Sequence, residues 1–143
     1  MTNLKPFFCL LTVLFVFWAC TKERTTPLEG AWKMVKGTYT DLESNQKIET
    51  DESQRFCIKI MSGHHFSVIE MFKDKPDSLF FAAVGTYKLS DDVYTETYEA
   101  SNVGYQIGAS REFVYNLQED RWTLNRSQEE MDLQETWVRV AQK

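Results

Sequence analysis

Apolar and polar residues alternate with a period of two in a series of short stretches after residue 29. This alternation is typical of strands that bury one face, and β-branched and aromatic residues are enriched in the same stretches. No stretch has the periodicity of a long helix. The pattern predicts eight strands, at residues 30–39, 55–62, 64–72, 79–89, 93–99, 110–118, 121–126 and 132–140.

Short connections predict that strands adjacent in sequence also pair in space. Residues typical of tight turns lie at 62–63, 74–77, 90–92 and 118–120. The polar segment 39–54 and the glycine-containing segment 99–109 are expected to be long surface loops. Consecutively paired antiparallel strands lose their free edges only by closing on themselves. We therefore predict an all-β fold, a single eight-stranded antiparallel up-and-down barrel.

The same period predicts which side chains face the barrel interior. In segment 79–89, Lys88 should point to water, so the alternate, apolar positions should point inward. The apolar faces predicted in this way are Phe81, Ala83, Gly85, Tyr87 and Leu89; Phe56, Ile58 and Ile60; Phe113, Tyr115 and Leu117; and Trp122 and Leu124. An eight-stranded barrel is filled by side chains or holds one small ligand. The pattern leaves both possibilities open.

An apolar run near the N-terminus predicts a targeting segment. Residues 6–19 (PFFCLLTVLFVFWA) follow a lysine and are too few for the ~20 residues of a membrane-spanning helix. The run ends in FWAC (17–20), which resembles the lipobox of bacterial lipoproteins. We expect residues 1–19 to be a lipoprotein signal peptide, Cys20 to be lipidated, and 20–28 to be a tether. A plain signal peptide and a single-pass anchor are the alternatives.

Charge and cysteine content narrow the possible partners. The chain has a formal net charge of −5, which becomes −6 without residues 1–19, whose only charge is Lys5. Nucleic acid binding requires clustered Lys and Arg on one face, so we expect no nucleic acid partner.

If Cys9 is removed and Cys20 is lipidated, Cys57 is left without a disulfide partner. Its apolar neighbours predict a partly buried, unreactive thiol.

Candidate catalytic and metal-binding groups are few. His64 and His65 are the only histidines. Neighbours on a strand point to opposite faces, so these two cannot bind one ion from regular strand geometry. The spacing of a zinc site and the elements of a hydrolase nucleophile are both missing. We expect no enzymatic activity, no metal and no cofactor.

Polar residues on an otherwise apolar face are the more informative candidates. Tyr94, Glu96 and Tyr98 share one face of a predicted strand. If that face is inward, the Glu96 carboxylate must be paired, hydrogen-bonded or protonated. Either a neighbouring tyrosine, Arg111 or solvent satisfies it, or Glu96 helps to select the polar end of an apolar ligand. The candidate ligand contacts are Tyr87, Tyr94, Glu96, Tyr98, Phe113, Tyr115 and Trp122.

Three blocks of sequence resemble a known family. They are LEGAWKMV, which contains Gly30 and Trp32, GTYKLSDDVYTET at 85–97, and ETWVRV at 135–140. In this order, and after a lipobox, they resemble the lipocalin-like domain of small exported lipoproteins from Gram-negative bacteria. The resemblance covers residues 28–141.

This resemblance implies structural roles and a domain boundary. It places Trp32 across the closed end of the barrel and Arg139 over its indole ring, and it makes Gly30, Trp32 and Arg139 structural rather than ligand contacts. Segment 39–54 takes the position of the lid at the open end. The lipocalin-like β-barrel domain would then span residues 29–141.

The expected function follows from these features together. We expect a monomeric lipoprotein of the cell envelope, anchored through its lipid in the outer membrane of a Gram-negative bacterium. Its barrel would bind a small hydrophobic or amphipathic ligand. The alternative is an interaction or inhibitor lipoprotein whose filled barrel presents loops to a protein partner.

Overall fold

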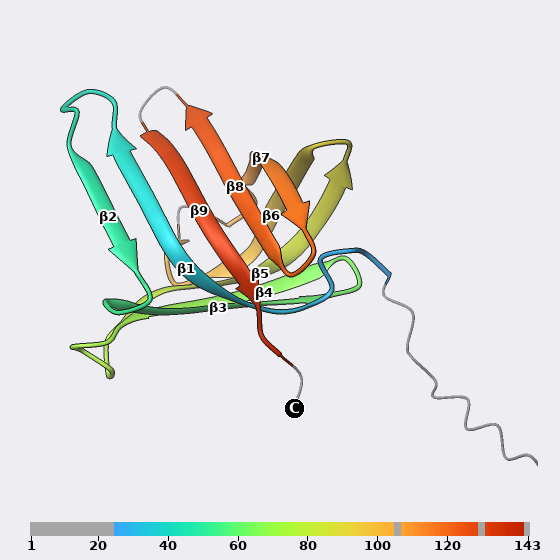
Figure 1. The fold of residues 1–143 in the computed structure, drawn as a ribbon, viewed down its shortest axis with the longest axis horizontal. Coiled ribbons are helices and arrows are strands. Elements are labelled where there is room, and N and C mark those ends of the chain that lie inside the picture. The colour runs from blue at the N-terminus through green and yellow to red at the C-terminus, as the bar shows by residue number, and fades with distance from the viewer. Residues whose placement is uncertain (1–24, 105–106, 129–130, 142–143) are drawn as a thin grey trace, which may run out of the picture.

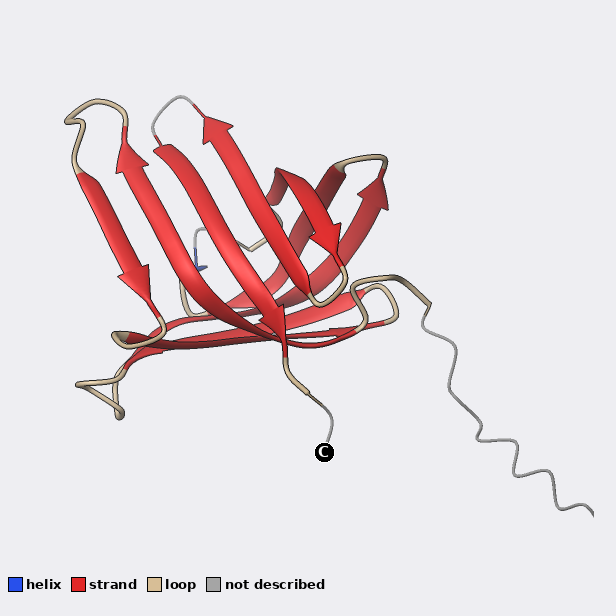
Figure 2. Ribbon diagram, in the orientation of Figure 1, coloured by secondary structure: helices blue, strands red, loops and turns tan. Residues whose placement is uncertain are grey.

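Strands joined by short loops form almost the whole of the described chain (Figure 2). The computed structural model describes residues 25–104, 107–128 and 131–141. Within these ranges the strands, as labelled in Figure 1, are β1 (Gly30–Asp41), β2 (Lys47–Asp51), β3 (Arg55–Ser62), β4 (His65–Phe72), β5 (Leu79–Ser90), β6 (Val93–Ser101), β7 (Ser110–Gln118), β8 (Arg121–Gln128) and β9 (Met131–Arg139). Every predicted strand is present.

The sheet closes into a barrel. Each consecutive pair from β3 to β9 is antiparallel, and β9 returns to pair with β1 from Trp32↔Arg139 to Asp41↔Met131. The predicted eight-stranded antiparallel barrel is therefore confirmed, and β2 is one additional strand at its side. Pairing the first strand with the last removes the two free edges that an open sheet would expose.

The segment expected to be a loop at 39–54 contains the additional strand. β2 pairs with the second half of β1, from Lys36↔Asp51 to Thr40↔Lys47. The prediction of a simple lid loop was wrong here, because β2 (KIETD) has one large apolar residue, Ile48, and lacks a clear alternation. Its charged side chains are those expected of an edge strand exposed to water.

Strand β1 changes its neighbour halfway along its length. Gly30–Lys33 pairs with β3, whereas Lys36–Thr40 pairs with β2 on the same side. β2 and the start of β3 therefore diverge, and we call the place where they separate the seam. Figure 1 shows β2 rising beside β1 while β3 runs across the base of the view.

A glycine allows the close approach of two strands on the far side of the barrel. The register of β5 and β6 shifts between Val84 and Gly85. A Cβ atom on Gly85 would lie 2.0 Å from the carbonyl oxygen of Thr97. Such bulges bend the strands and assist closure. A side chain at this position would force the two strands apart.

Most inward faces agree with the predicted ones, but the face of β3 does not. Ala83, Tyr87, Phe113, Trp122 and Leu124 are buried as expected. In β3 the buried residues are instead Cys57, Lys59 and Met61, while Phe56 and Ile60 are exposed on the outside. The apolar residues of β3 therefore lie on both faces, and the inward face carries a lysine. A partner for that lysine inside the barrel makes this arrangement possible.

Gly30, Trp32 and Arg139 close one end of the barrel. The Arg139 guanidinium carbon lies 4.1 Å from the ring centre of Trp32. Its Nη1 and Nη2 donate to the carbonyl oxygens of Glu29 and Pro27 at 2.6 and 3.0 Å, and its Nε pairs with Asp120 at 2.7 Å. Gly30 has a φ of 133°, and a Cβ there would lie 2.8 Å from Arg139 Nη1. The expected stacking of Arg139 on Trp32 is present.

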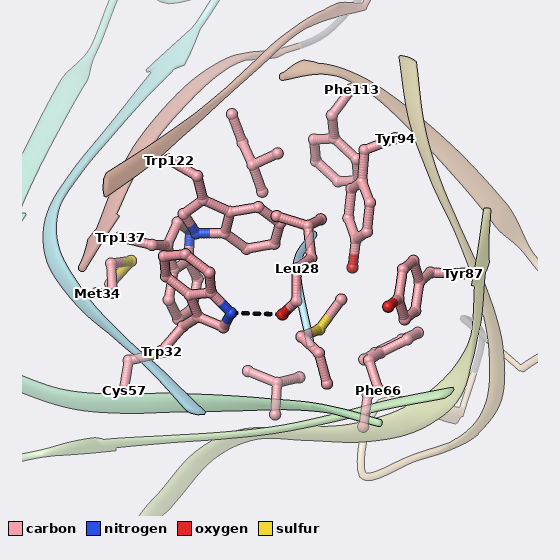
Figure 3. Packing of buried hydrophobic residues seen from close by; sticks show 14 of the residues in the cluster. Leu28, Trp32, Met34, Cys57, Phe66, Tyr87, Tyr94, Phe113, Trp122 and Trp137 are labelled. Carbon is pink, nitrogen blue, oxygen red and sulfur yellow. Dashed lines mark hydrogen bonds between the residues drawn. The ribbon is translucent and has the colours of Figure 1, made fainter. Parts of the chain in front are cut away.

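Large aromatic side chains fill the half of the barrel next to this closed end. Trp32 Nε1 donates to the carbonyl oxygen of Leu28 at 2.7 Å, shown as the dashed line in Figure 3. Trp32 stacks on Trp122 at a centroid distance of 5.4 Å, and Trp122 meets Tyr94 and Trp137 edge-on. We call this packed half the floor. Within the described residues, no helix is both long and apolar enough to span a bilayer.

Candidate functional site

A buried ion pair crosses the middle of the lumen, just above the floor. Lys59 of β3 and Glu96 of β6 are 4% and 2% exposed, and Lys59 Nζ lies 2.5 Å from Glu96 Oε1. The hydroxyl of Tyr94 donates to Oε1 at 2.6 Å, and that of Tyr98 donates to Oε2 at 2.8 Å. Tyr94, Glu96 and Tyr98 therefore share one face of β6, as expected, and that face is inward. The partner of Glu96 is Lys59, a residue that was not among the candidates.

Aromatic rings surround the ammonium group of Lys59. Its Nζ lies 5.0 Å from the ring centre of Trp137, and 5.6 to 5.7 Å from those of Tyr94, Phe66 and Trp122. Cation–π attraction is worth about 2 kcal/mol when the cation is desolvated. These contacts supplement the ion pair, which supplies the main compensation for burying the charge.

The surroundings keep both members of the pair charged. Burial opposes the charge of Lys59, but the neighbouring Glu96 and Glu135 carboxylates outweigh it and raise the Lys59 pKa above its ordinary value. Burial likewise opposes the charge of Glu96, but Lys59 and the two tyrosine hydroxyls lower the Glu96 pKa below its ordinary value. A protonated lysine has no lone pair, so Lys59 is suited to pairing and not to nucleophilic attack.

Glu135 of β9 is a second inward carboxylate next to the pair. Trp137 Nε1 donates to its Oε2 at 3.0 Å, and the Tyr39 hydroxyl donates to its Oε1 at 3.2 Å. Burial raises the pKa of Glu135 above its ordinary value, although Lys59 opposes this. We call Lys59, Tyr94, Glu96, Tyr98 and Glu135 the polar belt.

Above the polar belt, toward the end of β1, the inward side chains keep partial access to solvent. We call this half the mouth. Its partly exposed inward residues are Tyr39, Phe81, Arg111, Arg126 and Leu133. By contrast, Trp32, Trp122 and Trp137 in the floor are at most 1% exposed. The two halves of the lumen therefore differ in packing.

A cleft of about 520 Å3 lies at the seam on the mouth side. Its lining includes Ile48 and Thr50 of β2, Arg55 of β3, and Phe72 of β4. Arg55 pairs with Glu70 at 2.5 Å and lies over the rings of Phe72 and Phe80, at 4.8 and 4.4 Å. The volume is within the range of small-molecule pockets.

The seven candidate ligand contacts are divided between the two halves. Tyr87 and Trp122 lie in the floor, and the Tyr87 hydroxyl is hydrogen-bonded to Thr26 and donates to the Gly63 carbonyl oxygen at 2.8 Å. Tyr94 and Glu96 are enclosed within the polar belt. Phe113 is buried against Tyr94, while Tyr115 stays partly exposed. The Tyr98 hydroxyl donates to Glu96 in the polar belt, and the Tyr98 ring lies next to that of Phe81 in the mouth. Cys20 lies outside the described residues.

Sequence reasoning missed Lys59, Arg55 and Glu70 as interior residues. A signal for Lys59 was available: a predicted inward Glu96 needs a cation, and a lysine in the centre of an apolar strand is a natural donor. Two further expectations concern the histidines and Cys57. His64 and His65 are exposed. Cys57 is buried, and burial raises the pKa of its thiol, as expected for an unreactive cysteine.

Replacement of Lys59 tests the ion pair. We expect Lys59→Met to destabilise the fold by about 3–5 kcal/mol, because it leaves the Glu96 carboxylate buried without its cation. The double variant Lys59→Met/Glu96→Gln should be more stable than Lys59→Met, since no unpaired charge is left. Urea denaturation at pH 7 measures the free energy of unfolding of both variants. A double variant less stable than Lys59→Met would contradict this account.

Replacement of Glu135 tests the second carboxylate through pH. A carboxyl whose folded pKa is raised stabilises the fold fully below its ordinary pKa of 4.5, and that contribution is lost as pH rises through the folded pKa. Glu135→Gln stays neutral, so its stability relative to the wild type should increase from pH 4.5 to pH 8. Urea denaturation across this range measures the difference. Exposed Glu112→Gln is the control, and the same profile for both variants would refute the assignment.

Comparisons with known proteins place the chain in a family. A family described as a domain of unknown function, DUF4488, matches residues 27–143. The fold is similar to the crystal structure of an uncharacterized protein from Bacteroides eggerthii, with a TM-score of 0.53 and 17% identity over 78% of this chain and 98% of that chain. No match was found among curated proteins. The likeness in structure concerns the fold alone, but the family match includes every strand of the barrel, so the protein belongs to the DUF4488 family.

Proposed function

We propose that this protein is a lipid-anchored, lipocalin-like barrel of the bacterial cell envelope that binds one small hydrophobic or amphipathic molecule. The ligand would lie in the mouth, above the polar belt. The protein would act by binding and carry out no covalent chemistry.

The observation that carries this proposal is the difference between the two halves of the lumen. Tryptophan and tyrosine side chains fill the floor, so a ligand there would have to displace the core. In the mouth, the inward side chains keep partial access to solvent, and a cleft of about 520 Å3 lies at the seam at the same end of the barrel. Pockets combine apolar walls with a few polar groups. Phe81 and Leu133 supply such walls.

The polar belt supports ligand binding by closing the bottom of the mouth. Lys59 and Glu96 neutralise each other, and the Glu96 carboxylate also accepts hydrogen bonds from the hydroxyls of Tyr94 and Tyr98. The belt is therefore a rigid base and not a pair of free charges. Each Å2 of apolar ligand surface buried above it would contribute roughly 25 cal/mol.

The position of the N-terminal segment supports anchoring by the closed end. Thr26 is hydrogen-bonded to Tyr87, and Leu28 packs against Trp32 within the floor. A lipid on Cys20 would attach only a few residues before this contact. The barrel would then be held by its floor, and the mouth would face away from the membrane.

A substitution that fills the mouth tests ligand binding. The wild-type domain 21–143, purified from its own host, should carry a small molecule detectable by native mass spectrometry. Leu133→Trp adds a large inward side chain and should abolish that added mass, because the site is occupied. Val114→Trp is the matched control, since Val114 points outward and is 53% exposed. A wild-type protein with no added mass, and no thermal shift across a lipid library, would refute binding.

A second substitution tests the anchor. Cys20→Ala removes the acceptor for lipid, and we expect it to shift the protein from the membrane fraction to the soluble fraction. Cys57→Ala should leave the distribution unchanged, because Cys57 is inside the barrel. Equal membrane association of Cys20→Ala and wild type in cell fractionation would show that the anchor is not at Cys20.

The outer face of the barrel favours a second candidate function, docking of a protein partner. Phe56, Ile60, Ile69 and Val84 are 39 to 51% exposed on β3, β4 and β5. Exposed apolar patches of this kind are common at protein interfaces. A ligand-free mass for the wild-type domain would favour this candidate over ligand binding.

A further inference from the structure

The cleft at the seam follows from the way β1 changes its neighbour. β2 and β3 both pair with the same side of β1, and residues 52–54 separate them (Figure 1). We call the cleft of about 520 Å3 at this place the seam cleft. It is lined by three consecutive residues of β2, Ile48, Glu49 and Thr50. Because consecutive side chains of a strand point to opposite faces, the seam cleft runs along an edge of β2 and not along one face.

This edge of β2 has no strand partner, and the turns beside it are fixed. β2 pairs with β1 alone among the described strands, so its second edge carries backbone N–H and C=O groups that no strand bonds. The amide of Lys73 donates to the carbonyl oxygen of Gln54 at 2.9 Å, and that of Ser53 donates to the Asp51 carboxylate at 2.7 Å. The seam cleft is therefore organised before a ligand enters, which lowers the cost of binding.

The charged side chains of the seam cleft balance. Its lining includes two acidic residues, Glu49 and Asp74, and two basic residues, Arg55 and Lys73. Their ion-pair partners also balance, because Glu49 pairs with Lys47 at 2.6 Å and Arg55 pairs with Glu70 at 2.5 Å. The lining and these partners together carry no net charge, so they give no general attraction for an anion or a cation.

Thr50 supplies a buried hydroxyl group at the seam cleft. Thr50 is 4% exposed, and its Oγ1 has no hydrogen-bond partner among the described residues. Its methyl carbon, Cγ2, is the atom that packs toward Gly37 of β1, where a Cβ atom would lie 3.1 Å away. A hydroxyl can donate one hydrogen bond and accept two, and burying it without either is unfavourable. A ligand in the seam cleft would provide the missing partner.

Arg55 presents fixed donors to the same cleft. Its Nη1 donates to Glu70, and its guanidinium carbon lies 4.8 and 4.4 Å from the ring centres of Phe72 and Phe80. Nη1 is the only nitrogen of this side chain that is hydrogen-bonded to a described residue. The other N–H groups belong to the same planar fork and remain available. Phe72 and the 58% exposed Ile48 add apolar walls to the lining.

The lining argues against three classes of ligand. An apolar molecule would cover the donors and acceptors without bonding them, which is unfavourable. An anion or a cation would meet as many like charges as opposite ones. A neutral molecule with several hydroxyl groups fits better, because each hydroxyl both donates and accepts, and the C–H faces of a sugar ring can pack on apolar walls.

We infer that the seam cleft binds a neutral saccharide, whose hydroxyl groups bond to Thr50 and Arg55 and one of whose rings packs on Phe72. This site goes beyond the ligand proposed for the mouth and does not depend on it. None of the partly exposed inward residues of the mouth lines the seam cleft.

The test compares neutral sugars with probes that represent the three other classes. Maltose, cellobiose, lactose and N,N′-diacetylchitobiose are each titrated at millimolar concentration into the isotope-labelled wild-type domain 21–143, and amide shifts are followed by NMR. Sodium acetate, tetramethylammonium chloride and hexanol represent an anion, a cation and an apolar alcohol. We expect at least one disaccharide to give saturable shifts at the amides of Thr50, Gln54 and Lys73, and none of the other three probes to do so.

Variants then assign the sugar to the seam cleft. Thr50→Val should weaken binding of the preferred disaccharide by about fivefold or more without lowering the Tm, because the hydroxyl has no partner in the protein. Thr50→Ser keeps the hydroxyl and should retain the affinity. Phe72→Leu removes the aromatic wall and should also weaken binding. The matched control is Thr95→Val, since Thr95 lies between inward Tyr94 and Glu96, points outward and does not line the cleft. Thermal melts report whether each variant is folded.

Results that would overturn the saccharide site differ from those that concern the mouth. No saturable shift with any of the four disaccharides would overturn it and leave a ligand found by native mass spectrometry unaffected. Acetate, tetramethylammonium or hexanol shifting the same amides more tightly than every disaccharide would overturn the neutral sugar. Shifts centred on Phe81 and Leu133 would overturn the location at the seam. Equal affinities of Thr50→Val and Thr95→Val would overturn the role of the Thr50 hydroxyl.

Discussion

The pairing of Lys59 with Glu96 is the constraint on which the interior of this barrel depends. Each charge alone would be very unfavourable at this depth, so β3 and β6, which are not neighbours in the sheet, must present them at the same level. The ion pair connects opposite walls of the barrel, and it also marks the boundary between the floor and the mouth. Below it, the aromatic side chains are almost completely buried, and above it, the inward side chains are partly exposed.

Arginine side chains lie over aromatic rings at both ends of the barrel. At the closed end, Arg139 stacks on Trp32, and its donors are taken up by Asp120 and two carbonyl oxygens. At the open end, Arg111 lies over the ring of Tyr98 and Arg126 over the ring of Phe113, at 5.4 and 5.8 Å. The first arrangement stabilises the junction of the first and last strands. The conspicuous Gly30-x-Trp32 motif therefore belongs to the closed end of the barrel and to the stability of the fold.

Alternation and turn residues were sufficient to predict the eight-stranded barrel, and the family resemblance was sufficient to place Trp32 under Arg139. The face of Tyr94, Glu96 and Tyr98 also followed from the period of two. The face of β3 did not, because FCIKIM has apolar residues at both sets of alternate positions, and the choice depends on Glu96, far away in the sequence. β2 was not predicted, because it pairs with β1 through the backbone and has no alternating apolar face that the sequence would show.

The seam between β2 and β3 gives the barrel an uneven resistance to local unfolding. β2 is bound along β1 alone, whereas β9 lies between β1 and β8 and holds the closure. Detachment of β2 would expose few apolar groups and would leave the floor and the ion pair intact, so it belongs to the low free-energy end of native-state openings. A wall that loosens next to the mouth, while its base stays rigid, allows the entrance to widen for a bulky guest without a global transition.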